Sequence, residues 1–225
     1  SAPQTEDIGT SVEQKSVATA IEGIDSISSQ ESLTSSPVRL VGLTIKNFLA
    51  CSELIEIRID PFSILVGRND VGKSMILRAV NAFLGNEVID QDTPCRFSGS
   101  PLIEICGYFT PGDSRIDIDG GNKTTFADEI LLDGQGRFCI KKIWNASTDK
   151  PKPEIWLYGP VFGDCLLTST EVQLRQRCAT FDIATNKANG DEFNNAEKRR
   201  KIADHYIDVL NEPPVMDWVL IGTTG

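Results

Sequence analysis

The pattern of apolar and polar positions between residues 38 and 59 predicts a β-hairpin. VRLVGLTI (38–45) has the composition of a strand. In SELIEIRI (52–59) three isoleucines alternate with charged residues at a period of two, which puts Ile55, Ile57 and Ile59 on one face. The intervening KNFLACS predicts the turn of the hairpin.

The next residues predict a buried strand, a loop and a helix. FSILV (62–66) is a short apolar run of the kind found in strands that are buried on both faces. After a glycine-containing loop, KSMILRAVNAFLG (73–85) has the helical period and ends at Gly85, a residue type that commonly terminates helices. The apolar face of this helix is formed by Ile76, Val80 and either Phe83 or Leu84.

The middle of the chain predicts an antiparallel sheet. Three stretches, 101–110, 124–145 and 152–159, are rich in β-branched and aromatic residues with alternating character. Residues 133–136 form a hairpin turn signal, and residues 148–153 predict a further connection.

From about residue 165 the pattern becomes helical. Thr168 and Glu171 fit a capping box for a helix through residue 178, and Asn194 or Asn195 can begin a second helix. That helix is expected to end before the prolines at 213 and 214. The final run, DWVLIGTTG, is strand-like.

These patterns divide the chain into three parts. Residues 1–37 have no aromatic residue and carry six acids against one lysine, so we expect a flexible, low-complexity tail. Residues 38–164 form the main α/β lobe. Residues 165–225 form a helical segment and the start of a second lobe.

Composition favours an intracellular protein with a substantial core. The 225 residues are 40% hydrophobic, and the chain shows neither a membrane-spanning apolar run nor a secretory signal. We therefore expect a cytoplasmic protein without a membrane partner, with the nucleus as an alternative location. Six scattered cysteines predict buried free thiols, and the lone His205 is given no role. The net charge of -10 argues against a broad nucleic-acid-binding face.

The loop before the helix carries a complete phosphate-binding motif, G-x-x-x-x-G-K-[ST], from Gly67 to Ser74. Gly67 and Gly72 let backbone N–H groups approach the β-phosphate. Lys73, the candidate catalytic residue, places a cation against the β- and γ-phosphates, and Ser74 offers a hydroxyl to Mg²⁺. We expect ATP and Mg²⁺ as cofactors. The remaining loop residues expected to bind the nucleotide are Arg68, Asn69, Asp70 and Val71.

Three other patterns imitate functional motifs. Asn-Lys pairs at 122–123 and 186–187 lack the aspartate of the guanine-reading N/T-K-x-D motif, which argues against a GTPase. The segment from Asp117 lacks the sixth-position glycine and twelfth-position glutamate of a calcium loop. The basic run KRRK (198–201) could touch nucleic acid, but acids flank it on a predicted helix, so a solvated helix face is the preferred interpretation.

The stretch LTIKNFLACSELIEIRIDPFSILVGRNDVGKSMILRAVNAFL resembles the N-terminal lobe of the ABC-type ATPase heads of the SMC, RecF and RecN group. It is most similar to the overcoming-lysogenization-defect (OLD) family of ATPase-nucleases. This resemblance rests on three features: the L-T-I-K-N-F hairpin, the N-D-V-G-K-S sequence of the loop and the later I-E-I strand. It implies an α/β P-loop NTPase fold, with a mixed sheet, an antiparallel β subdomain and a C-terminal helical segment.

The resemblance also implies partners and further site residues. In such heads two copies meet face to face with ATP between them, so a homodimer is implied, and DNA can bind through the assembly. Lys46, Asn47 and Phe48 match the family's hairpin-turn motif, near the base and ribose of the nucleotide. The chain departs from the family at Leu49, where a basic or polar residue is common.

Some motifs that the resembled family needs for ATP hydrolysis are not found in this sequence. The family needs a strand ending in Asp-Glu and a signature loop from the partner head, but no run of four apolar residues here precedes Asp-Glu, and no nuclease lobe is present. Gln173 and Gln176 could sense Mg²⁺, but both fall in a predicted amphipathic helix, where surface residues are expected. A general base contributes roughly 10² to 10⁴ in rate and partner-supplied charge about 10³ to 10⁵. We therefore expect the chain alone to bind ATP but hardly to hydrolyse it.

The resemblance implies ATP hydrolysis in the complete protein, coupled to DNA repair, DNA processing or phage defence. Two alternatives stay open. One is a non-catalytic module in which ATP only drives the pairing of two heads, and the other is a P-loop kinase for a small phosphate acceptor.

Overall fold

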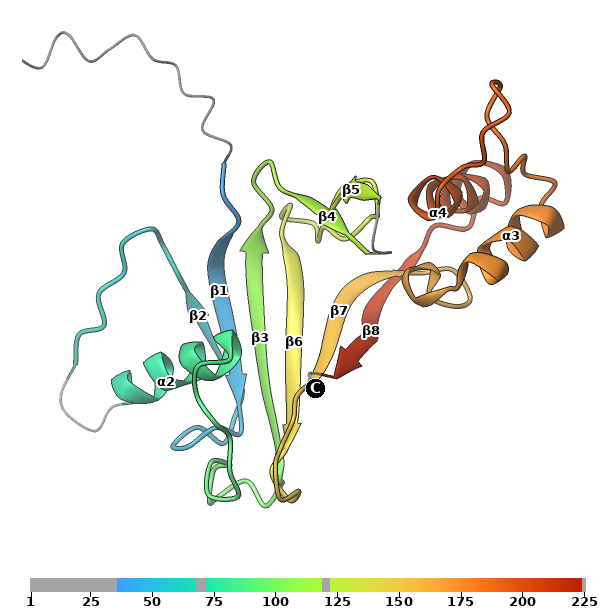
Figure 1. Cartoon of the computed structure of the whole chain (residues 1–225). Helices are drawn as coiled ribbons and strands as arrows, with labels where there is room; N and C mark the ends of the chain where they lie inside the picture. Colours follow the sequence, from blue (N-terminus) through green and yellow to red (C-terminus); the bar gives the residue numbers. More distant parts are fainter. Residues whose placement is uncertain (1–35, 68–71, 119–121, 224–225) are drawn as a thin grey trace, which may run out of the picture. The chain divides into compact units, whose positions relative to one another are not determined.

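The computed structural model of the chain describes residues 36–67, 72–118 and 122–223. Its main element is a six-stranded sheet with the order β2-β1-β3-β6-β7-β8 (Figure 1). Every neighbouring pair in this sheet is antiparallel, as is the separate β4–β5 hairpin. The strands are β1 (Arg39–Lys46), β2 (Ile55–Arg58), β3 (Leu102–Thr110), β4 (Arg115–Asp117), β5 (Lys123–Thr125), β6 (Phe138–Asn145), β7 (Glu154–Val161) and β8 (Val215–Thr223).

The helices come in two groups. Helix α2 follows the glycine loop, and the others lie between β7 and β8 in the sequence. Their bounds are α2 (Lys73–Leu84), the 3-10 turn η1 (Leu166–Thr168), α3 (Glu171–Thr180), α4 (Asn195–Asp204) and the π-helical turn η2 (His205–Val209). The antiparallel sheet and the helical stretch after residue 165 are confirmed. The parallel strands of the expected mixed sheet do not occur among the described residues.

The predicted hairpin is confirmed as β1 and β2. The two strands pair antiparallel with Leu43 opposite Ile57. Ile55, Ile57 and Ile59 pack on the main core, so the period-two pattern identified the buried face correctly. The final strand, β8, pairs with β7 and so extends this same sheet.

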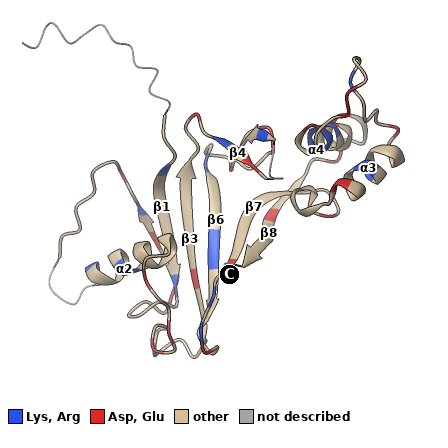
Figure 2. Cartoon of the chain, in the orientation of Figure 1, with Lys and Arg blue, Asp and Glu red and all other residues tan. Residues whose placement is uncertain are grey.

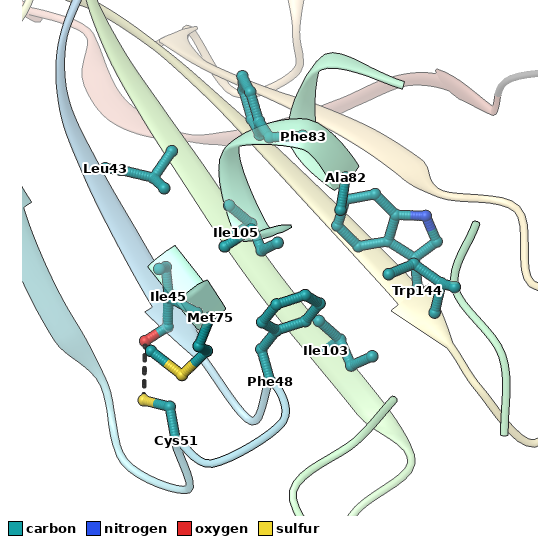
Figure 3. Packing of buried hydrophobic residues seen from close by; sticks show 12 residues of the cluster. Leu43, Ile45, Phe48, Cys51, Met75, Ala82, Phe83, Ile103, Ile105 and Trp144 are labelled. Atoms are coloured by element: carbon teal, nitrogen blue, oxygen red, sulfur yellow. Dashed lines mark hydrogen bonds between the residues drawn. The ribbon is translucent and has the colours of Figure 1, made fainter. Parts of the chain in front are cut away.

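Helix α2 packs on one face of the sheet, and the main core lies between them (Figure 3). The cluster joins Ala79 and Phe83 of the helix to Ile103 and Ile105 of β3. Of the two alternatives for the apolar face, Phe83 is buried while Leu84 is 56% exposed. The helix that carries the phosphate loop is therefore positioned by the β1–β3–β6 part of the sheet.

A glycine on β3 sets how closely α2 approaches the sheet. A Cβ atom added at Gly107 would lie 2.8 Å from Cζ of Phe83 and 2.8 Å from Cε2 of Phe109. Both distances are shorter than a normal carbon contact, so the absence of a side chain lets these two rings pack over the strand.

We expect Gly107→Ala to destabilise the protein by about 1–3 kcal/mol, because the new methyl group overpacks this interface. Equilibrium unfolding in urea measures the change. The matched control is Gly134→Ala, since a Cβ at Gly134 meets nothing within 4 Å and Gly134 lies outside the core. Equal effects of the two substitutions would contradict the role given to Gly107.

The expectation that residues 62–66 form a buried strand is wrong for this structure. The segment belongs to no strand, and Phe62, Ile64 and Val66 are 81%, 67% and 87% exposed. A strand buried on both faces needs hydrogen-bonded neighbours and a covering layer. None of the described strands pairs with this segment, so it lacks the hydrogen-bonded neighbours that a buried strand needs.

Both helices begin with a capping side chain as predicted, but the first capping box lies at other residues than expected. The first capping box is formed by Thr170 and Gln173, two residues later than the predicted Thr168 and Glu171. Thr168 instead ends the turn η1, and its hydroxyl donates to the carbonyl of Cys165. In α4, Asn194 is the N-cap and exchanges hydrogen bonds with Glu197.

The basic run 198–201 is only in part the solvated face that we expected, since the Arg200 side chain is 64% exposed but two of the other cations are buried. Figure 2 places its cations on α4, but Lys198 and Arg199 are only 1% and 2% exposed. Lys198 donates to the carboxylate of Glu192 at 2.7 Å. Arg199 makes two 2.8 Å hydrogen bonds to the carboxylate of Glu129. Burial of these two cations removes them from any nucleic-acid contact.

The cysteines are confirmed as free thiols, and five of the six are buried. Burial raises the pKa of Cys106 to about 11 and that of Cys139 to about 12. Both thiols therefore stay protonated at neutral pH, which is the inert state of a structural cysteine. Among the described residues, no helix is long and apolar enough to cross a membrane.

Candidate functional site

The phosphate loop is described at both of its ends. Gly67 precedes it, and Gly72, Lys73 and Ser74 follow it at the start of α2. Residues 68–71 lie outside the described residues. The nucleotide contacts expected of Arg68, Asn69, Asp70 and Val71 therefore stay predictions from the motif.

Lys73 reaches back across the loop. Its ammonium group donates a 2.6 Å hydrogen bond to the carbonyl oxygen of Gly67. This contact joins the residue before the loop to the first residue of the helix. It places a positive charge beside the carbonyl of Gly67, and the motif requires a cation there for the β- and γ-phosphates.

The N-terminus of α2 is arranged for an anion. Gly72 is its N-cap with φ at 90°, and no side chain caps the helix start. The N–H of Ile76 makes the first bond of the helix ladder, to the Gly72 carbonyl at 3.1 Å. No acidic residue lies in this first turn, and Ser74 is exposed there. A phosphate group is the ligand that such a helix end favours.

The other end of α2 is held by one predicted contact and one that was missed. Gly85 has φ at 87° and donates to the carbonyl of Ala82, as expected for a helix-ending glycine. In addition, the ammonium of Lys142 donates to the carbonyl of Phe83 at 2.7 Å. Burial lowers the pKa of Lys142. In the sequence, the only sign of this second contact is that a lysine, Lys142, falls on the core-facing side of a strand.

The turn after β1 is fixed by Asn47. This residue is 2% exposed with φ at 54°. Its amide nitrogen donates to the carbonyls of Ser100 and Leu102, and its amide oxygen accepts from the N–H of Cys95. All of these partners are backbone groups, so the side chain shapes the turn from within.

Lys46, the neighbour of Asn47, points outward and pairs with Glu104 at 3.3 Å. Leu49 completes the turn with φ at 51°, and its N–H donates to the carbonyl of Thr93. The nucleotide contact expected of Lys46 and Asn47 stays a prediction.

The glutamines considered for Mg²⁺ sensing are both exposed on α3. The side-chain oxygen of Gln173 accepts from the N–H of Thr170 at 2.7 Å as part of the capping box. Gln173 therefore has the helix-capping role that the sequence pattern predicted for Glu171.

The described residues contain no group of three or more His, Cys, Asp or Glu side chains that could hold a metal ion. The hydroxyl of Ser74 is the protein ligand that the motif offers to Mg²⁺. The other ligands would come from the nucleotide phosphates and water, as is common for this ion.

These features define a P-loop nucleotide-binding domain. They are the hairpin, the G-x-x-x-x-G-K-S motif, and a helix whose first lysine reaches across the loop. The sequence model of the AAA ATPase domain family matches residues 39–212, and the chain belongs to this family. No curated protein sequence matches the chain. The family confirms the P-loop ATPase class that the motif and the resemblance predicted.

Proposed function

We propose that this chain is the ATP-binding part of an OLD- or SMC-like ATPase that hydrolyses ATP in a complete, dimeric protein. The observation that carries the proposal is the 2.6 Å contact of Lys73 with Gly67 at the uncapped start of α2. It brings a cation to the start of a helix that no side chain caps, and a nucleotide phosphate binds at such a helix end.

Two observations support the view that this site needs a further lobe or partner. Residues 62–66, which lead into the loop, expose apolar side chains instead of pairing in a sheet. The described residues also hold no acidic cluster that could position Mg²⁺ and water for hydrolysis. In the complete protein, a further lobe would supply the acidic residues, and a second head that closes over the nucleotide would supply the signature loop. The link to DNA repair, DNA processing or phage defence rests on family resemblance alone.

We expect the chain to bind Mg-ATP and to release phosphate slowly. The charge-stabilising groups absent from the chain are worth about 10³ to 10⁵ in rate. A fluorescent-nucleotide titration measures binding, and a phosphate-release assay measures turnover. Light scattering with and without ATP reports whether nucleotide drives pairing.

The titration, the phosphate-release assay and light scattering together distinguish the proposed function from its alternative. Binding with slow turnover supports the proposal. Tight nucleotide-dependent pairing that leaves ATP intact, also in the full-length protein, would favour a nucleotide-gated interaction module. Failure to bind ATP would overturn both.

A further inference from the structure

The two edges of the six-stranded sheet differ in how they are protected. One edge is β2, which has four residues and directs the charged Glu56 and Arg58 away from the core. Short edges with charged side chains resist pairing with other strands. In the described part of the chain, the opposite edge is β8, which has nine residues and one strand neighbour, β7.

Strand β8 has little of the usual protection. Its one acid, Asp217, accepts a 2.7 Å hydrogen bond from the N–H of Trp218, and its register with β7 shifts between Leu220 and Gly222. Its sequence, VMDWVLIGT, has no lysine, arginine or proline and a single acid, Asp217. Val215 is 68% exposed and Leu220 is 43% exposed. A long, apolar, exposed edge strand is a template for addition of another strand.

An aromatic row crosses the sheet face opposite α2 and reaches this edge. Tyr158 lies directly opposite Trp218, with ring centroids 5.4 Å apart. The ammonium of Lys141 lies 4.3 Å from the Trp218 ring centroid. The row therefore ends on β8 with an indole whose other neighbour would be a residue of an added strand.

The sequence of β8 complements itself when two copies run antiparallel about Trp218. Trp218 then faces Trp218 of the partner subunit, and Met216 faces Leu220 of the partner subunit. Asp217 faces Val219 of the partner subunit, so like charges do not meet. Aromatic and apolar cross-strand pairs of this kind stabilise sheets. The segment 216–220 also precedes the irregularity at Leu220–Gly222, where regular pairing with β7 is interrupted.

We propose that β8 pairs antiparallel with β8 of a second copy of this chain, joining two sheets across a twofold axis at Trp218. The contact is isologous, since the same strand serves both partners. It lies on β8, apart from the phosphate loop, and so forms without nucleotide.

Multi-angle light scattering of the full chain tests the pairing. We expect a mass twice the 24.6 kDa of one chain, with and without ATP and in Lys73→Ala. Leu220→Lys should weaken dimerisation at least about tenfold, because each strand would set an ammonium against an apolar partner. The matched control is Leu77→Lys, which changes a leucine that is 59% exposed on α2. Circular dichroism verifies that both variants fold.

Spin labels at Val215→Cys test the register. The background carries Cys165→Ser, because the other five cysteines are buried. Pairing about Trp218 separates the two 215 positions by six residues, or about 20 Å, whereas a shift of the centre to 219 gives about 27 Å. A monomer at every concentration, a dimer that needs ATP, or equal weakening by Leu220→Lys and Leu77→Lys would overturn this proposal. A monomer or equal weakening by the two variants leaves the ATP-binding proposal untouched, whereas a dimer that needs ATP would support the pairing of heads through nucleotide.

Discussion

We expect the substitution Lys73→Ala to abolish Mg-ATP binding. The lysine ammonium is the cation that the motif provides for the phosphates, and it donates a 2.6 Å hydrogen bond to the carbonyl of Gly67. Loss of charge-assisted hydrogen bonds to phosphate costs about 3 kcal/mol or more, which weakens binding by a factor of about 100 or more. A fluorescent-nucleotide titration in the presence of Mg²⁺ measures the affinity.

The matched control for this experiment is Lys150→Ala. Lys150 is an exposed lysine in the connection between β6 and β7, so its removal changes net charge equally without touching the loop. Circular dichroism should show both variants folded, because the Lys73 side chain lies outside the core. Unchanged nucleotide affinity in Lys73→Ala would refute the assignment of this loop as the ATP site.

The second large effect is expected at the buried ion pair between Glu129 and Arg199. Both side chains are 3% exposed, and the pair makes two hydrogen bonds of 2.8 Å. It joins the turn after β5 to α4, which are 70 residues apart in the sequence. Arg199→Met leaves the Glu129 carboxylate buried without its partner, and we expect a loss of about 3–5 kcal/mol in the free energy of unfolding.

The neighbouring pair provides the control. Arg200 and Asp128 form an ion pair with side chains that are 64% and 43% exposed. Arg200→Met should therefore cost at most about 1 kcal/mol. The double variant Glu129→Leu/Arg199→Met should recover most of the lost stability, since it removes both buried charges. Urea denaturation measures all four proteins. Similar costs for Arg199→Met and Arg200→Met would show that burial does not set the value of this pair.

Much of the nucleotide site could be predicted from local sequence. The order of glycines, Lys73 and Ser74 is a contiguous motif, and Gly85 ends α2 through its own backbone conformation. Lys142 could not be found this way, because its contact with Phe83 depends on β6 packing against the helix. Asn47 carried a motif match, but only the fold shows that its amide is used by backbone groups of the 95–102 loop.

The basic run 198–201 shows where helical patterns mislead. Four consecutive cations cover more than half of the helix circumference, so some of them must face inward if the helix packs. The sequence does not show which acidic residues form ion pairs with the cations that face inward. Glu129 and Glu192 come from distant or looped segments, and they turn a predicted solvated face into a partly buried network.

The sequence by itself determined the hairpin, the helix α2 and the antiparallel sheet, because these depend on the period of apolar residues and on short-range turn and cap signals. It also determined the P-loop ATPase class, because that motif is contiguous. The tertiary structure alone decided which cations are buried, how closely α2 approaches Gly107, and that residues 62–66 form no strand. Those features depend on contacts between residues that are far apart in the chain, and the local sequence pattern does not show which residues will meet.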